Sequence, residues 1–142
     1  MNLARLKQLQ SDGFYSLIAA RPDLLYTSHE RGIAPIMNML KRDQSYFHDC
    51  IIVDKIIGKA AAMLLTLSHA QYIHGQLMST NAMRYLDEHG IAYSYDHACD
   101  IIINRTGTGM CPMEETVANV NDSQAAYRAL CIKLDQLMKD RR

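Results

Sequence analysis

Apolar residues recur along the chain with two periods, and each period predicts a different element. Leucines at every third position from Leu3 to Leu9 predict a short first helix, which residues 11–13 (Ser-Asp-Gly) end. The runs Phe14–Ala20 and Leu24–Ser28 predict the two strands of a hairpin. Residues Gly32–Leu40 follow helical spacing again, so a second helix is expected there.

The rest of the chain alternates apolar runs with helical patterns. The predicted strands are 50–57, 70–78, 91–95 and 98–103, and the predicted helices are 59–67, 82–88, a short one from Pro112, and 123–138. Strands that alternate with short helices predict an α/β protein, a three-layer α/β/α sandwich. A length of 142 residues predicts a single domain over residues 1–142.

Composition narrows the class of protein. Hydrophobic residues make up 49% and charged residues 21%, as in ordinary globular domains. The formal net charge is zero, which removes the electrostatic case for general nucleic-acid binding. The basic residues Lys139, Arg141 and Arg142 predict a solvated tail. Charges at Asp54, Lys55 and Lys59 interrupt the longest apolar region and argue against a membrane span.

The four cysteines are widely spaced and form no CxxC pair. A disulfide-stabilised secreted domain would be shorter and richer in cysteine. The pattern therefore predicts reduced thiols and a cytoplasmic protein.

The segment Asn104–Glu115 holds two glycines, a thiol, a proline and two carboxylates. It follows the predicted strand 98–103, and a loop between a strand and a capped helix is where α/β proteins place ligands. Proline prefers the first helical position, so Cys111 is the predicted N-cap, and a thiol there has a lowered pKa. One interpretation makes Cys111 a nucleophile with Glu114 as a base. The other makes Cys111 a small residue packed under the loop, with the glutamates capping the helix.

Cysteine–histidine catalysis also needs a histidine in space, and the fold would have to bring His48, His74 or His97 close. Asn104 and Arg105 follow the predicted strand at its carboxyl end, where open α/β sheets bind ligands. Arg105 can clamp a carboxylate or phosphate with two hydrogen bonds, or it can pair with a glutamate of its own loop.

Four motifs together resemble a known family. They are Asp54–Ala62, the segment that ends at Ser79, Asn104-Arg105, and Cys111–Glu114, in this order. The resemblance is to the uncharacterised DUF1893 family, which is placed in the cytidine deaminase-like superfamily, and it runs from about Phe14 to Leu137. It implies a deaminase-like mixed sheet with helices on both faces. It implies no activity, because the family has none to carry over.

The zinc ligands of base deaminases are missing. Those enzymes carry H-x-E at one helix start and P-C-x-x-C at the next. In this chain the corresponding starts are Gly58-Lys59-Ala60 and Ser79-Thr80-Asn81, which offer no histidine, glutamate or cysteine. No metal site and no cofactor are therefore predicted.

Two helix N-termini without zinc still expose N–H groups and positive dipole ends. Gly58, Lys59, Ser79 and Thr80 predict a site for the phosphate or carboxylate of a small ligand. The alternative is that Gly58 only ends the strand and Lys59 is solvated.

Asp54 interrupts an apolar strand, on the opposite face from Lys55. A buried Asp54 needs a partner, so it would orient Lys59 or a ligand hydroxyl. A strand end that reaches solvent is the alternative.

Three classes of function stay open. The favoured one is binding of a small anionic or nucleotide-like ligand in the cleft at the helix N-termini. The second is a zinc-independent enzyme with Cys111 as nucleophile, assisted by Glu114, Asp54 or Lys59. The third is a non-catalytic assembly protein. Whether the chain is an enzyme stays open, as does a homodimer through apolar helices or strand edges.

Overall fold

A mixed five-stranded sheet organises the protein, with strand order β2-β1-β3-β4-β5. The structure is a computed structural model and describes residues 2–140. The strands are β1 Leu17–Arg21, β2 Leu24–Ser28, β3 Ile51–Ile57, β4 Tyr72–Ser79 and β5 Ala92–Cys99. β1 runs antiparallel to β2 and β3, whereas β3, β4 and β5 run parallel to one another. The carboxyl ends of these three parallel strands therefore meet at one edge of the sheet.

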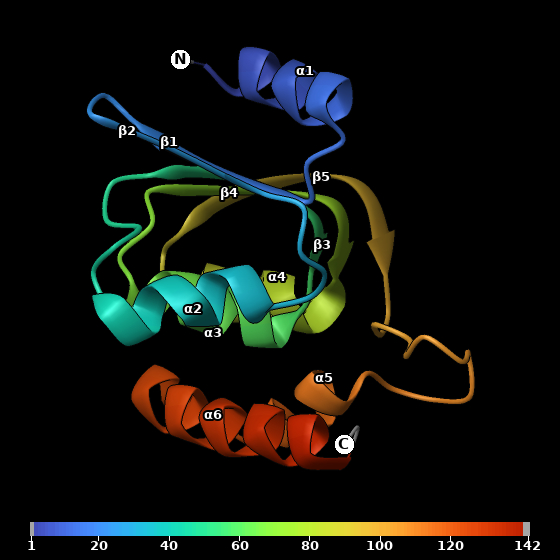
Figure 1. The fold of residues 1–142 in the computed structure, drawn as a ribbon. Helices are drawn as coiled ribbons and strands as arrows, with labels where there is room; N and C mark the ends of the chain where they lie inside the picture. Colours follow the sequence, from blue (N-terminus) through green and yellow to red (C-terminus); the bar gives the residue numbers. More distant parts are fainter. Residues whose placement is uncertain (1, 141–142) are drawn as a thin grey trace.

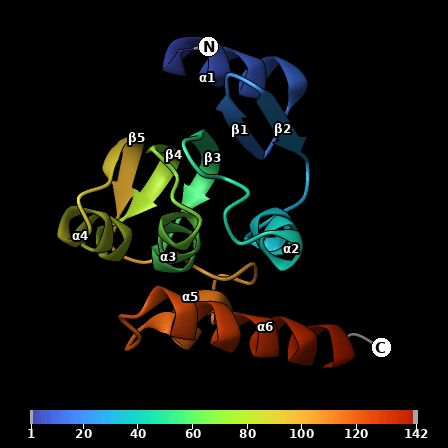
Figure 2. The same cartoon turned by 90° about the vertical axis from the view of Figure 1, so that its left-hand side faces the viewer.

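Helices cover both faces of the sheet (Figures 1 and 2). They are α1 Leu3–Gly13, α2 Ala34–Arg42, α3 Lys59–Leu67, α4 Thr80–Glu88, α5 Pro112–Val117 and α6 Ser123–Asp140. Figure 2 shows α1 on one face, α2, α3 and α4 on the other, and α5 and α6 on the outer side of that helical layer. The predicted α/β layering is present, and α5 and α6 add to it. No helix within residues 2–140 has both the length and the apolar character that crossing a bilayer demands.

The central helix is α3, and it explains why the sandwich holds together. Residues 60–65 are all buried, which is typical of a helix surrounded by other elements. α3 contacts α2, α4, α5 and α6 as well as β3. Its N-terminus therefore lies at the carboxyl edge of the parallel strands, enclosed by several elements.

A smaller core lies under α1. Leu6 packs with Ile18, Ala20 and Val53 on the face of β1 and β3 that looks toward α1. Phe14 follows the helix with a φ of 54°, and its N–H bonds back to Ser11. The prediction that a strand begins at Phe14 was wrong, because Phe14 ends α1 in a left-handed conformation.

The two strands predicted at 91–95 and 98–103 are one strand, β5. The pairing with β4 passes through the gap between the two predicted strands and continues through Met78↔Ala98 and Ser79↔Cys99, whereas residues 100–103 lie in a loop. β5 is an edge strand, so polar side chains are tolerated along it. Residues 100–110 form a loop, closed by an isolated bridge between Ile103 and Met110.

Candidate functional site

Two helices begin directly where two parallel strands end. β4 leads into α4 through Ser79, whose hydroxyl accepts the N–H of Ala82 at 3.1 Å. β3 leads into α3 through Gly58, which has no side chain to serve the same purpose. The free N–H groups at the start of α3 therefore need an acceptor from elsewhere.

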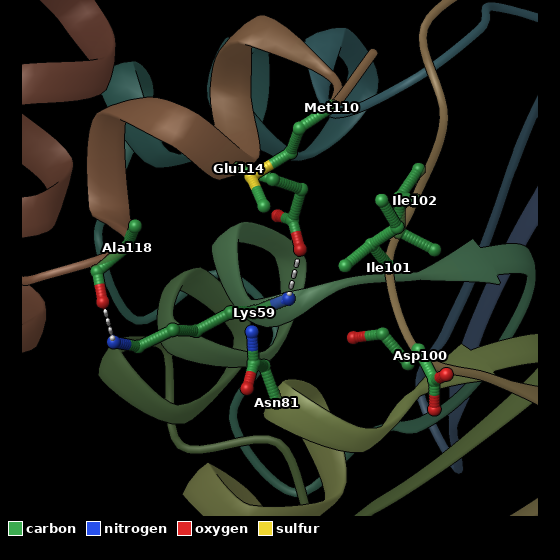
Figure 3. Close-up of a pocket in the computed structure, with 9 residues that line it drawn as sticks. Lys59, Asn81, Asp100, Ile101, Ile102, Met110, Glu114 and Ala118 are labelled. Carbon is green, nitrogen blue, oxygen red and sulfur yellow. Dashed lines mark hydrogen bonds between the residues drawn. The ribbon is translucent and has the colours of Figure 1, made fainter. Parts of the chain in front are cut away.

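Glu114 of α5 supplies that acceptor from 55 residues further along the chain. Its Oε1 accepts the Lys59 N–H at 2.7 Å (Figure 3), and its Oε2 accepts the Ala60 N–H at 2.9 Å. The carboxylate is 9% exposed. A negative charge at this position also interacts favourably with the positive end of the helix dipole. The N-terminus of α3 thus binds an anion that the chain itself provides.

Gly58 creates the space for this contact. Its φ is −97°, which any residue can adopt, so backbone freedom is not the reason for glycine. A Cβ atom at Gly58 would overlap Oε1 of Glu114. Gly58 therefore permits a close approach to the backbone, and the group that approaches is the Glu114 carboxylate.

The Lys59 ammonium turns away from this carboxylate. Its Nζ donates to the carbonyl oxygen of Ala118 at 3.2 Å, at the end of α5 (Figure 3). Burial lowers the pKa of Lys59, and the Glu114 charge raises it in part. Burial raises the pKa of Glu114, and the N–H groups of Ala60 and Lys59 lower it in part. Glu114 is therefore held as an acceptor although the site disfavours its charge.

A crevice of about 10 Å³ remains between the two helix N-termini and the loop 100–110. It is lined by Lys59, Ser79, Asn81, Asp100, Ile101, Ile102, Met110, Glu114 and Ala118. This volume holds about one water molecule. Lys59, Ser79 and Glu114 thus surround one crevice. In this conformation protein atoms occupy the space around it and leave no room for a small-molecule ligand.

Several lining residues escaped the sequence analysis. Asp100, Ile101 and Ile102 belonged to a predicted strand, whereas they lie in the loop that covers the crevice. Met110 and Ala118 carry no local signal of a site. Asn81, in the predicted cap segment, and Met110, next to Cys111, each lay beside a candidate residue.

The other predicted ligand residues lie at or beyond the rim. Thr80 donates to the carbonyl oxygen of Asp100 at 3.3 Å and so ties α4 to the loop. Asn104 closes its own turn, because its Oδ1 accepts the Thr108 N–H at 3.0 Å. Arg105 is exposed in the same turn. The prediction that Asn104 and Arg105 follow directly on a strand was wrong, since β5 ends at Cys99.

Cys111 is the N-cap of α5, as predicted, but its side chain makes no capping hydrogen bond. The thiol packs against the main core and is not among the residues that line the crevice. No hydrogen bond joins it to a histidine within residues 2–140. The same residues contain no group of three histidine, cysteine or acidic side chains arranged to hold a metal ion.

Asp54 is buried in the sheet. It is 6% exposed and lies between Leu17 of β1 and Gly75 of β4, on the face toward the main core. Burial raises its pKa to about 7, although the backbone N–H groups of Ile56 and Lys55 lower it in part. Lys55 is exposed, so the two residues do occupy opposite faces. Asp54 is therefore not a strand end that reaches solvent.

Replacing Asp54 with asparagine will stabilise the protein above pH 7. A pKa of about 7 in the folded state, against an ordinary 3.8, means that the free energy of unfolding falls as pH rises between these values. The change corresponds to at most about 4 kcal/mol at 1.36 kcal/mol per unit of pKa.

Urea denaturation at pH 5 and pH 8 measures the effect of Asp54→Asn. The variant should gain more stability at pH 8 than at pH 5, where only part of the penalty has developed, while Asp135→Asn on the exposed side of α6 changes neither. A loss of stability at pH 8 would show that the ionised Asp54 is bound favourably, contrary to this account.

Replacing Gly58 with alanine will displace Glu114 from the start of α3. Buried N–H groups then lose their acceptor, and the cost is about 2–3 kcal/mol. In a Glu114→Ala background the same change should cost at least about 1 kcal/mol less, because the clash is gone. Thermal and urea unfolding of the four proteins test this coupling. Gly109→Ala is the control, since a Cβ there meets no atom within 4 Å. If the effects of Gly58→Ala and Glu114→Ala on the free energy of unfolding simply add, the contact between Gly58 and the Glu114 carboxylate is contradicted.

Comparison with known proteins identifies the family. Residues 5–134 match the family model described as a domain of unknown function, DUF1893. The chain is also similar to the crystal structure of a DUF1893 family protein from Thermotoga maritima, with 27% sequence identity and a TM-score of 0.83. This similarity covers 92% of the present chain and 88% of the other. A search of curated proteins finds no match. The family predicted from the four sequence motifs is confirmed, and the chain belongs to the DUF1893 family.

Proposed function

We propose that the protein is a metal-free, deaminase-like domain that binds a small anionic or nucleotide-like ligand at the N-terminus of α3. The observation that carries the proposal is the pair of adjacent N–H groups, on Lys59 and Ala60, that hold two oxygens of one anion. A ligand carboxylate or phosphate presents the same two oxygens. In the present conformation Glu114 occupies the position of the ligand group.

Ligand binding in this scheme requires Glu114 to leave. The crevice of about 10 Å³ has no room for a metabolite beside it. Burial already disfavours the charged form of Glu114. A phosphate group is a stronger acid than a carboxyl group, so it would stay ionised in this site more readily than Glu114. Movement of α5 and the loop 100–110 would open the site.

Polar groups around the crevice would complete recognition. Ser79 and Asn81 line it and would contact ligand hydroxyl or base atoms. In the opened site Lys59 would exchange the Ala118 carbonyl for the ligand anion. Thr80, Asn104 and Arg105 would contribute from the rim, and Asp54 would act from the strand beneath.

The mixed sheet, in which one antiparallel strand adjoins three parallel ones, supports the deaminase-like assignment. The four free cysteines suit a reducing compartment, so we infer a cytoplasmic protein. An enzyme that uses Cys111 has less support, since its side chain packs against the core and no hydrogen bond within residues 2–140 joins its thiol to a histidine. No contact favours the assembly role or a homodimer.

Removing the Glu114 carboxylate and restoring an anion from solution tests the proposal. Glu114→Ala should lose about 1–3 kcal/mol of unfolding free energy, because two buried donors lose their acceptor. Phosphate or acetate at ten times its dissociation constant should then return about 1.4 kcal/mol. That corresponds to a rise of about 3–6 °C in melting temperature.

Thermal unfolding with increasing acetate, phosphate or AMP is the measurement. Glu115→Ala is the matched control, because Glu115 lies in the same turn but is exposed. Stabilisation that is specific to Glu114→Ala supports an anion site. Equal shifts in the wild type and both variants would mean that Glu114 is a structural cap and nothing more.

A further inference from the structure

The opposite face of the sheet carries an open groove of about 300 Å³. It is lined by Lys7, Gln10, Ser11, Phe14, Lys55, Gln76 and Asp96. α1 packs over β1 and β3 (Figure 2), and the residues that line the groove belong to this helix, to Phe14 after it, and to β3, β4 and β5. Its volume is at the lower end of the range for small-molecule sites, which begins at about 300 Å³.

Three polar side chains form a row across the floor of this groove. The strands pair at Asp54↔Gly75↔Tyr95 and again at Ile56↔Leu77↔His97, so Lys55, Gln76 and Asp96 lie at one level between them. The row presents a cation, an amide and an anion from three neighbouring strands. Polar residues are expected on a sheet face open to water, and the row alone is therefore not a site.

A buried histidine behind the row distinguishes this surface from an ordinary solvated face. His74 is 3% exposed, and its Nδ1 lies 2.7 Å from the Ser94 hydroxyl. Its Nε2 is buried, has no hydrogen-bond partner, and points toward Asp96, with 3.4 Å to Oδ2. Nε2 lies within ion-pair distance of the Asp96 carboxylate, so His74 anchors this wall of the groove from inside the sheet.

Asp96 is held from two sides, which leaves its charge compensated. The Lys7 ammonium donates to Oδ1 at 2.9 Å and, with His74, holds the pKa of Asp96 below its usual range. Lys55 forms no salt bridge within residues 2–140. The groove therefore offers one uncompensated ammonium group to an incoming ligand.

Phe14 adds a flat apolar surface at the edge of the groove. Its side chain is 81% exposed, and its φ of 54° is a conformation in which glycine or asparagine is more favourable. An exposed aromatic ring in such a position serves no packing purpose in the fold. Beside a free cation, it suits a ligand that has its own ring.

We propose that this groove is a second binding site, for a small ligand with a flat ring and one anionic group. Lys55 binds the anionic group, Phe14 stacks on the ring, and Gln76 bonds to a polar edge. Lys7 and His74 are positioning residues that fix Asp96 in the wall. Aromatic carboxylates and nucleoside monophosphates share this chemistry. The site is independent of Glu114 and of the crevice at α3.

Titration of the ¹⁵N-labelled protein with benzoate and with AMP tests this site and separates the two sources of ligand. At least one probe should give saturable amide shifts at Phe14, Lys55 and Gln76. Lys55→Gln should weaken binding about tenfold, the effect of one charged contact. Phe14→Asn should weaken it about threefold to tenfold by removing a stacking partner, while asparagine tolerates the backbone conformation.

The controls separate this site from the crevice and from damage to the fold. Lys55→Arg should retain binding, and Lys41→Gln, an exposed lysine on α2 across the sheet, should not change it. Glu114→Ala should leave unaltered the affinity measured from the amide shifts of Phe14, Lys55 and Gln76.

Three results would overturn the proposal. One is no saturable shift with either probe up to about 10 mM, an affinity too weak for a specific site. The second is equal binding of inorganic phosphate, which would remove the role of the ring. The third is a set of shifts confined to the surroundings of Lys59, which would move the ligand to the crevice and support the first site at the expense of this one.

Discussion

The start of α3 depends on a carboxylate that lies 55 residues away in sequence. Without Glu114 the N–H groups of Lys59 and Ala60 would be buried with no acceptor, which is costly for any helix end. Because Gly58 has no side chain, the contact can be short enough to satisfy both groups at once. This interaction fixes α5 against α3 and therefore fixes the direction in which the chain enters α6. The cap acts together with the buried side chains of Met113, Val117, Ala126 and Leu130, which pack α5 and α6 onto the main core.

The contact between Glu114 and the start of α3 stabilises the fold and, at the same time, competes with any ligand anion for the same N–H groups. A helix end that binds a carboxylate well will bind a ligand anion by the same geometry, but only in the fraction of molecules where Glu114 has left. The apparent affinity of such a site is reduced by that fraction. α5 has only six residues, and besides Glu114 and the Lys59–Ala118 bond it is held by Met113 and Val117, which pack in the main core, so opening would expose these two side chains as well. The segment that completes the fold is therefore also the segment that a ligand would displace.

Local signals were sufficient to predict the β3–α3 and β4–α4 units, because apolar periodicity and the cap at Ser79 act within a few residues. They were insufficient where distant contacts decide. Nothing near Glu114 distinguishes it from Glu115, yet one is the buried cap and the other is exposed. The missing side chain at Gly58 was the one hint, and it pointed to a ligand without showing that the chain supplies its own.

The sequence analysis divided β5 into two strands, because an edge strand with one face open to water carries polar residues such as Asp96 and so lacks a continuous apolar pattern. The groove was missed because its residues come from α1 and from separate strands.

Two buried polar groups in the middle of the sheet lower the stability of this fold without serving its packing. Asp54 lies on the helical face, in the strand that leads to Gly58, and its raised pKa shows that its environment penalises the charge. His74 lies on the α1 face, behind the groove, with an unsatisfied nitrogen. An aliphatic residue at either position would fit a sheet core better. His74 contacts Asp96 in the wall of the groove, and Asp54 lies on the other face, in the strand that leads to the α3 crevice. This correspondence is what a protein with a separate binding function on each face would show, since perturbed polar groups persist where function requires them.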